Sequence, residues 1–232
     1  NIGSVGFENV ACVFDETRLQ RNCSIITDSD AIVKGAEKSN LTAMKRGATR
    51  KEKLSNLFAA NSYVKAFYAS HTLEVDFASE KNNQGFICEI IQNSYKDAAI
   101  IKKHISAIES GTEAERYDSV MTIVNHIKKG WYATLLAETI DASTIIPMYI
   151  LDAIVFAARD ILSEKLLFKI AKYSFEQYKS DSNPDDLKTA FQNAKSSKEI
   201  QDTIRVFCDK FPDDMASLFI TKAGALNVGL SE

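Results

Sequence analysis

The sequence predicts a mixed α/β protein, with an α/β unit in the first part of the chain and a helical region after it. A β-branched run, Ser24 to Thr27, ends abruptly in the carboxylates Asp28 and Asp30, as a buried strand ends at its carboxyl edge. From residue 82 onward, apolar residues recur at helical spacing instead. The fold class is therefore α/β, with an additional helical region in the C-terminal part.

Composition narrows the classes of function. The chain has 232 residues and a formal net charge of −3, which argues against a generally basic nucleic-acid binder but leaves a local basic surface open. Its four cysteines are scattered without zinc spacing, so we expect them reduced in a cytoplasmic protein. No run of 18 apolar residues occurs, and no membrane span is expected. Because the chain begins at Asn1 rather than Met, we expect it to be a piece of a longer protein.

The elements before residue 82 are expected to be short. Two β-rich pieces, at residues 2–5 and 10–14, precede the Asp-tipped strand, and residues 63–68 return to strand character. Between the two main strands, residues 34–53 are polar and basic. They predict either a solvated loop leading into a first helical turn or a strand-edge loop that touches a phosphate backbone.

The helical region predicts long helices followed by shorter ones. One helix is expected from Glu113 to about Thr139, and another from Pro147 to about Tyr178, since proline suits the first turn of a helix. Breaks are expected at residues 182–186, 195–198 and 211–214. This pattern predicts a small bundle of short helices at the C-terminus.

The Asp28 and Asp30 pair is the first candidate for chemistry. In an extended chain, residues two apart point the same way, so both carboxylates can converge on one hard cation. Ligands of open α/β sheets also gather outside the carboxyl ends of strands. The alternative is an Asx turn that closes the strand.

Glu74 and Lys129 are the other two candidates. Glu74 follows a strand-like run, and a carboxylate near an Asp pair suits two bridged divalent ions, although a first-turn acid favoured by the helix dipole is the alternative. Lys129 precedes Gly130, and a glycine inside a helix costs about 1 kcal/mol, so close packing or a nearby ligand is expected to compensate. Lys129 could stabilise charge on a phosphate, or it could be a surface lysine. Trp131 is expected to be a core anchor.

The order of these three motifs resembles a known arrangement. The chain reads Thr27-Asp28-x-Asp30, then Thr72-Leu73-Glu74-x-Asp76-x-Ala78, then Lys129-Gly130-x-x-Ala133. It resembles the Toprim nuclease domain of the overcoming-lysogenization-defect (OLD) family of endonucleases, which includes the nuclease subunit of the Gabija defence system. The resemblance covers residues 1 to about 155.

The resemblance implies a role for each motif. Asp28, Asp30 and Glu74 would be metal ligands, and two Mg²⁺ or Mn²⁺ ions are expected. Glu74 would also be catalytic, as the acidic ligand of the second metal site. Lys129 would be catalytic by stabilising the transition state, and Lys128 would take its place if the register differs by one. Asp76 is a weaker candidate.

The resemblance also implies a fold and a function. It predicts a Toprim, Rossmann-like parallel sheet with a helical insertion in residues 1–155, and a helical C-terminal domain in residues 156–232. The implied activity is divalent-metal-dependent hydrolysis of DNA phosphodiester bonds in anti-phage defence. The implied partners are DNA, an upstream ABC-type ATPase domain of the same protein, a second copy of the chain, and a helicase or another defence-system protein.

One part of the family pattern is missing from this chain. The family's fold begins with a glutamate after its first strand, and Glu8 and Glu16 lie in a different context. No Walker-type glycine loop occurs either. Two alternatives therefore stay open: another Toprim chemistry, such as that of a topoisomerase or primase, and a non-catalytic helical assembly domain that carries a degenerate Toprim site.

Overall fold

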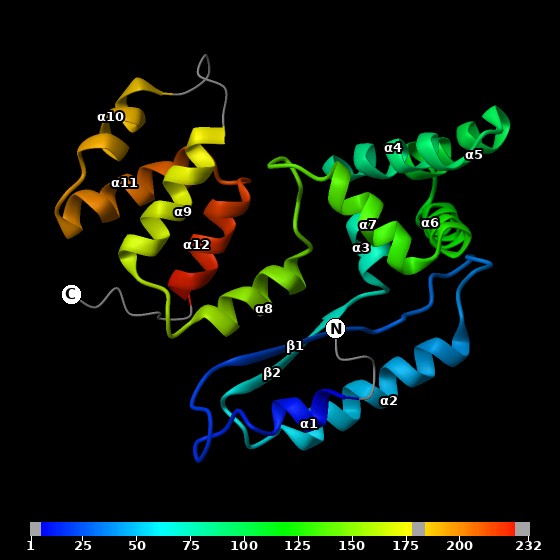
Figure 1. The fold of residues 1–232 in the computed structure, drawn as a ribbon, viewed down its shortest axis with the longest axis horizontal. Coiled ribbons are helices and arrows are strands. Elements are labelled where there is room, and N and C mark those ends of the chain that lie inside the picture. The colour runs from blue at the N-terminus through cyan, green and yellow to red at the C-terminus, as the bar shows by residue number, and fades with distance from the viewer. Residues whose placement is uncertain (1–5, 178–183, 226–232) are drawn as a thin grey trace. The chain divides into compact units, whose positions relative to one another are not determined.

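The computed structural model describes residues 6–177 and 184–225 (Figure 1). Its two strands are β1 (Cys23–Asp28) and β2 (Val64–Ala69). The helices before residue 95 are α1 (Phe7–Ala11), α2 (Leu41–Leu57), α3 (Leu73–Ser79), the 3-10 turn η1 (Lys81–Asn83) and α4 (Gln84–Ser94). The later helices are α5 (Ala98–Ser110), α6 (Glu113–Ile127), α7 (Lys129–Thr139), α8 (Met148–Ala158), α9 (Glu164–Gln177), α10 (Asp185–Asn193), α11 (Ser197–Lys210) and α12 (Met215–Ala225).

The chain forms two compact units. Unit 1 comprises Asn1–Val10, Ile25–Asn61 and Ala66–Ile150, and unit 2 comprises Ala11–Ser24, Ser62–Lys65 and Leu151–Glu232. Within the described residues, no helix is long and apolar enough to cross a bilayer. The domain boundary expected near residue 155 stays a prediction.

The two strands form a small parallel sheet, which confirms the α/β class and both predicted strand positions. The backbone N–H of Cys23 donates to the Tyr63 carbonyl over 2.7 Å, and that of Ser29 donates to the Ala69 carbonyl over 3.1 Å. Both strands therefore keep one register from end to end, and their carboxyl ends lie together.

The strand predicted at residues 10–14 is wrong, and the one predicted at residues 2–5 lies outside the described residues. The chain is helical in α1 and turns where the Phe14 N–H donates to the Ala11 carbonyl over 3.0 Å. Val10 is exposed, so its β-branched side chain is not needed in a sheet core. The side chain of Glu8 pairs with Lys53 on α2 and ties α1 to that helix.

The basic stretch at residues 34–53 is mostly helix, so the loop predicted there is wrong over most of its length. The Asn40 side chain caps α2 by accepting hydrogen bonds from the N–H groups of Thr42 and Ala43. Leu54 is buried under the far end of the helix. Because most residues of this stretch are charged or polar, the sequence does not readily show the capping residue and the few buried positions that support a helix.

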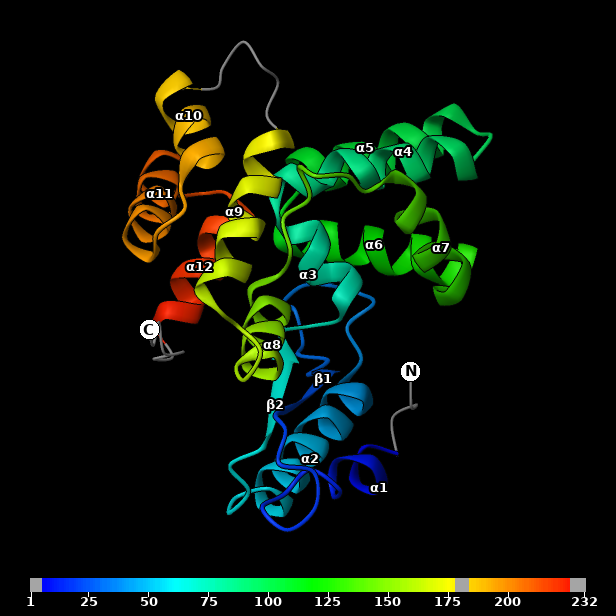
Figure 2. The same cartoon turned by 60° about the vertical axis from the view of Figure 1, so that its left-hand side comes forward.

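Helices α3 to α7 form the core of unit 1 (Figure 2). Helix α4 packs against α5 and α7, and α6 packs against α3 and α5. Their buried faces carry β-branched and aromatic residues at helical spacing, as the sequence predicts from residue 82 onward. The largest fully buried side chains of this core are those of Ile87, Ile90, Ile91, Ile108, Val120, Ile123, Val124 and Tyr132.

Each of the two long predicted helices is divided in the structure. The first breaks at Lys128, which has φ 78° and ψ 136° between α6 and α7. The second breaks between α8 and α9, where the Ile161 and Leu162 N–H groups donate to the Ala158 carbonyl. Apolar spacing continues across both breaks, because each following helix buries residues in the same core, and periodicity alone does not reveal them.

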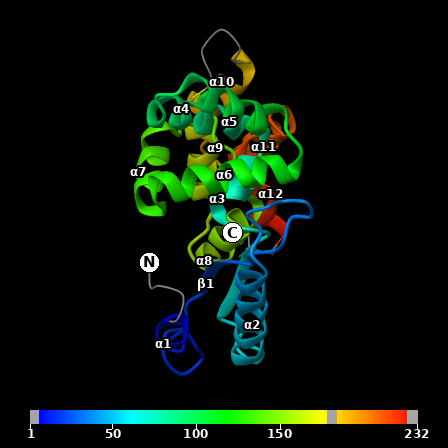
Figure 3. The same ribbon diagram turned by 90° about the vertical axis from the view of Figure 1, so that its right-hand side faces the viewer.

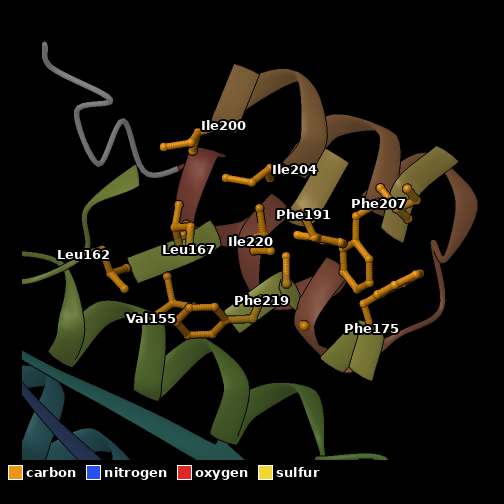
Figure 4. Packing of buried hydrophobic residues seen from close by; sticks show 14 of the residues in the cluster. Val155, Leu162, Leu167, Phe175, Phe191, Ile200, Ile204, Phe207, Phe219 and Ile220 are labelled. Atoms are coloured by element: carbon orange, nitrogen blue, oxygen red, sulfur yellow. The ribbon is translucent and has the colours of Figure 1, made fainter. Parts of the chain in front are cut away.

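Unit 2 has a core of its own, shown in Figure 4. Phe207 of α11 is fully buried and packs edge-on to Phe191 of α10, which in turn contacts Phe175 of α9. Helix α11 begins with a reciprocal capping box between Ser196 and Glu199. The breaks predicted at residues 195–198 and 211–214 fall at the ends of α10 and α11, and part of the break at 182–186 lies outside the described residues.

Candidate active site

The end of β1 positions Asp28 at the carboxyl edge of the sheet. Beyond it, the N–H groups of Ser29 and Asp30 donate to the carbonyls of Ala69 and His71 over 3.1 and 2.9 Å. The turn after β1 is therefore fixed against the residues that follow β2. The same residues lead into α3, so the end of one strand and the start of the next helix become neighbours.

Lys129 brings the three predicted motifs together. Its Nζ lies 3.4 Å from Oε1 of Glu74 and 3.9 Å from Oδ2 of Asp28. The three side chains come from α7, α3 and the end of β1, which are separate segments of unit 1. We call Asp28, Glu74 and Lys129 the carboxylate–lysine site.

Glu74 is the least exposed of these three residues. It lies in the first turn of α3, and its side chain is 13% exposed. Its second oxygen, Oε2, is buried without a hydrogen-bond partner. A buried carboxylate oxygen without a partner is energetically costly, and a bound cation or a hydrogen-bond donor would remove this cost.

Asp30 lies beside this site but turns toward a different cation. Its φ of 53° is in the left-handed region, so the extended conformation ends before it. The Arg50 guanidinium on α2 lies 3.4 Å from Oδ2 of Asp30 and donates to the Asp28 carbonyl over 2.6 Å. In contrast to the extended-chain prediction, the Asp30 carboxylate pairs with Arg50 while that of Asp28 faces Lys129. Sequence reasoning placed Arg50 in the basic stretch but missed this contact.

Gly47 allows α2 to approach the aspartate turn closely. A Cβ atom at this position would lie 2.2 Å from the Ser29 carbonyl oxygen, a distance that real contacts do not show. The absence of a side chain thus lets the helix axis come near the turn, and Arg50, one turn later, can reach both aspartates.

Tyr132 borders the site and was missed by sequence reasoning. It lies on α7 three residues after Lys129, a spacing that places both on neighbouring positions of one helix face. Its hydroxyl is buried without a hydrogen-bond partner. Burial, and then the charge of Glu74, raise the pKa of the Tyr132 phenol. Tyr132 therefore stays protonated and can act as a hydrogen-bond donor.

Tyr149, at the start of α8, is a second aromatic neighbour. Burial raises the pKa of its phenol, and the charges of Asp76, Asp28 and Glu74 add to that effect. No spacing in the sequence links Tyr149 to these carboxylates, since 73 or more residues separate it from each of them. Only the folded chain shows that this phenol lies near the acidic residues.

Asp76 and Lys128 have structural roles. The Asp76 carboxylate accepts hydrogen bonds from the Ser70 and His71 N–H groups over 2.7 and 3.1 Å and holds the loop between β2 and α3. Lys128 adopts a backbone conformation that favours glycine and separates α6 from α7. As a result, Lys129 is the first residue of α7 and projects from a helix start.

The predicted environments of Gly130 and Trp131 are wrong. Gly130 lies in the first turn of α7 rather than inside a long helix, and a Cβ there would meet nothing within 4 Å. The glycine therefore does not interrupt a long helix, and no close packing offsets its cost at this position. Trp131 is 61% exposed, while Tyr132 takes the buried position beside it.

The charges at this edge of the sheet do not cancel locally. Burial raises the pKa of the Asp28 carboxyl, and the charges of Glu74 and Asp30 add to this increase. The Lys129 ammonium and a hydrogen bond from the Leu73 N–H act in the opposite direction without reversing it. A cation close to Asp28 would relieve this repulsion between carboxylates.

The donor set is chemically suited to Mg²⁺ or Mn²⁺, since carboxylate oxygens are the ligands that these ions prefer. The unpartnered Oε2 of Glu74 and the repulsion at Asp28 both fit a bound cation. Among residues 6–177 and 184–225, no three His, Cys, Asp or Glu side chains are gathered as ligands of a single ion. Water or substrate oxygens would have to complete the coordination.

Comparisons with known proteins place the chain in no family. No protein-family model, curated protein or solved structure matches it.

Proposed function

We propose that this chain is the nuclease part of a divalent-metal-dependent DNA endonuclease of the OLD type, with a Toprim site at the carboxyl edge of its sheet. One observation carries the proposal. The carboxylates of Asp28 and Glu74 both lie within 4 Å of the Lys129 ammonium group. The sequence resemblance singles out these three residues in three distant motifs. This contact brings the three predicted motifs to one place at the carboxyl edge of the sheet.

Asp28 and Glu74 would hold the metal ions, and Asp30 would join them once its carboxylate leaves Arg50. Bound there, Mg²⁺ or Mn²⁺ would neutralise charge on a phosphate oxygen and favour deprotonation of an attacking water. The unpartnered Oε2 of Glu74 supports this assignment, because a carboxylate oxygen buried without a donor has spare acceptor capacity.

The protein's own donors would act on the phosphate. The Lys129 side chain is 58% exposed, so its ammonium can face both the carboxylates and an incoming phosphodiester. As charge grows on the non-bridging oxygens, an ammonium fixed at a helix start would stabilise it without rearrangement.

A second candidate function rests on unit 2. Helices α9 to α12 bury a complete apolar core, which an assembly or partner-binding domain would need, and Ile161 and Tyr173 stay exposed beside it. In that case the carboxylate–lysine site would be a relic. Loss of metal-dependent cleavage on mutation would decide between the two functions.

Cleavage of supercoiled plasmid in Mg²⁺ or Mn²⁺ tests the proposal. We expect the wild-type chain to nick or cut the plasmid, and Asp28→Asn and Glu74→Gln to abolish cleavage with normal circular dichroism spectra. Asp202→Asn, a carboxylate on α11, is the matched control and should cleave like wild type. Equal cleavage by all four proteins, or none by any of them with either metal, would count against this chain as a nuclease.

A further inference from the structure

A groove of about 560 Å³ runs between α1 and α2 in unit 1. Figures 1 and 3 show the two helices side by side. The α2 wall is lined by Lys45, Arg46, Arg50 and Lys53, together with the hydroxyl residues Thr42 and Thr49. The apolar side chains of Phe7 and Leu54 line it as well. The groove is therefore a channel with basic and hydroxyl groups along one side.

The charge of this groove contrasts with that of the whole chain. Helix α2 carries five basic residues and one acidic residue, whereas the chain as a whole has a net charge of −3. Glu8 is the acidic residue among the groove-lining residues, and it is paired with Lys53. Lys45 and Arg46 are exposed and, with Arg50, leave the groove net positive. A polyanion with regularly spaced charges would match this surface.

Arg50 connects the groove to the carboxylate–lysine site. One of its terminal nitrogens lies 2.6 Å from the Asp28 carbonyl, so the residue belongs to both places. Its Nε is buried without a hydrogen-bond partner. The Arg50 side chain is 20% exposed, and arginine binds phosphate oxygens through the N–H groups at its exposed edge.

We propose that the groove between α1 and α2 binds the phosphodiester backbone of DNA and directs it toward Asp28. Lys45 and Arg46 would contact successive phosphates, and Arg50 would contact the phosphate nearest the carboxylates. The inference rests on the proposed function, since it names where the substrate of that site binds. It also gives the basic stretch of residues 34–53 a role on a helix rather than on a loop.

Fluorescence anisotropy with a short labelled DNA duplex tests the groove in EDTA, where metal-dependent cleavage cannot interfere. Lys45→Gln/Arg46→Gln should weaken binding about tenfold and lower the slope of log affinity against log salt by about two. Lys45→Arg/Arg46→Lys keeps both charges and should bind like wild type. Lys165→Gln/Lys169→Gln removes two exposed charges from α9 and should also bind like wild type.

Two results would contradict the proposal that the groove binds DNA. One is no binding of DNA by the wild-type chain, and the other is equal binding by the Gln/Gln groove variant and the α9 control. Plasmid cleavage by the same variants separates this inference from the proposed function. If the Gln/Gln groove variant binds DNA normally while Asp28→Asn still abolishes cleavage, DNA binding in the groove is rejected and the proposed nuclease activity is kept. If the groove variant loses DNA binding but the wild type never cleaves, the proposed nuclease activity is rejected and DNA binding in the groove is kept.

Discussion

The Lys129 ammonium faces two carboxylates from other segments, at 3.4 Å from Glu74 and 3.9 Å from Asp28. Lys128, its neighbour, instead serves as the strained residue between two helices. The two lysines are adjacent in sequence but have different environments, because the chain direction changes between them. This difference decides which lysine can act on a phosphate.

Lys129→Met should reduce plasmid cleavage by about 10²- to 10³-fold, since it removes a donor fixed beside the developing charge. Lys128→Met should cleave within a few-fold of wild type. Initial rates of nicking in Mn²⁺ measure both effects. The reverse ranking of the two variants would mean that the register of the lysine motif is off by one.

At this scale, the structure brings together Asp28, Glu74 and Lys129, which the sequence singles out in three motifs. Their metal-binding and catalytic roles stay a prediction. The left-handed backbone of Asp30, which turns its carboxylate toward Arg50, depends on how α2 packs against the turn. The burial of Tyr132 in place of Trp131 depends on the helix start at Lys129, and local composition does not encode it.

At the scale of single elements, helix α2 packs against the turn after β1 and contacts the aspartates there. Gly47 lets the helix approach Ser29, and Arg50 on the same helix then contacts both aspartates. The sequence contains the necessary glycine and arginine, but their purpose appears only when the neighbouring backbone is known. The breaks at Lys128 and after Ala158 likewise occur without a proline or a change in apolar spacing that would predict them.

Gly47→Ala should lower the free energy of unfolding by about 1–3 kcal/mol, because the added methyl group collides with the Ser29 carbonyl. Gly85→Ala on α4 is the control: a Cβ there meets nothing within 4 Å, so the substitution should be neutral or stabilise by up to about 1 kcal/mol. Urea unfolding measures both. Equal effects would show that α2 does not approach the turn as closely as described.

The capping box of α11 predicts a pH dependence. Hydrogen bonds from the backbone N–H groups of Ser196 and Lys195 lower the pKa of Glu199 to about 2, from an ordinary value of 4.5. The unfolded chain therefore binds more protons between these values, and the stabilisation from Glu199 is complete above about pH 4.5 and lost as pH falls toward about 2.

Glu199→Gln should thus be less stable than wild type at neutral pH, and the difference should shrink toward about pH 2. Glu138→Gln, in the last turn of α7 and outside any capping box, is the control and should not lower stability at neutral pH. Thermal unfolding at a series of pH values measures both variants. A constant gap between Glu199→Gln and wild type would contradict the capping role of this carboxylate.

At the scale of the whole molecule, two separate apolar cores support the two units. The sequence predicts an α/β part followed by helices, and the domain boundary expected near residue 155 stays a prediction. It does not predict that residues 11–24 and 62–65 group with the C-terminal helices, because such groupings depend on contacts between residues far apart in the chain.

Phe207→Ala should lower the free energy of unfolding by about 3–5 kcal/mol, because Phe207 is fully buried in the unit 2 core. Hydrogen exchange should show the loss of protection in α9 to α11, while α4 to α6 keep theirs. Tyr173→Ala, at a residue 68% exposed on α9, should change little. Uniform loss of protection across the chain would mean that the two cores unfold as one.

Binding of Mn²⁺ by the full chain tests the central claim most directly, and thermal unfolding reports it without requiring cleavage. At about 100 times the dissociation constant, Mn²⁺ should stabilise the wild type by about 2.7 kcal/mol, and the gain should vanish in Asp28→Asn/Glu74→Gln. A control double variant, Glu138→Gln/Asp202→Asn, should keep the gain. Equal stabilisation of wild type and both variants, or no stabilisation of any, would contradict a metal site at Asp28 and Glu74.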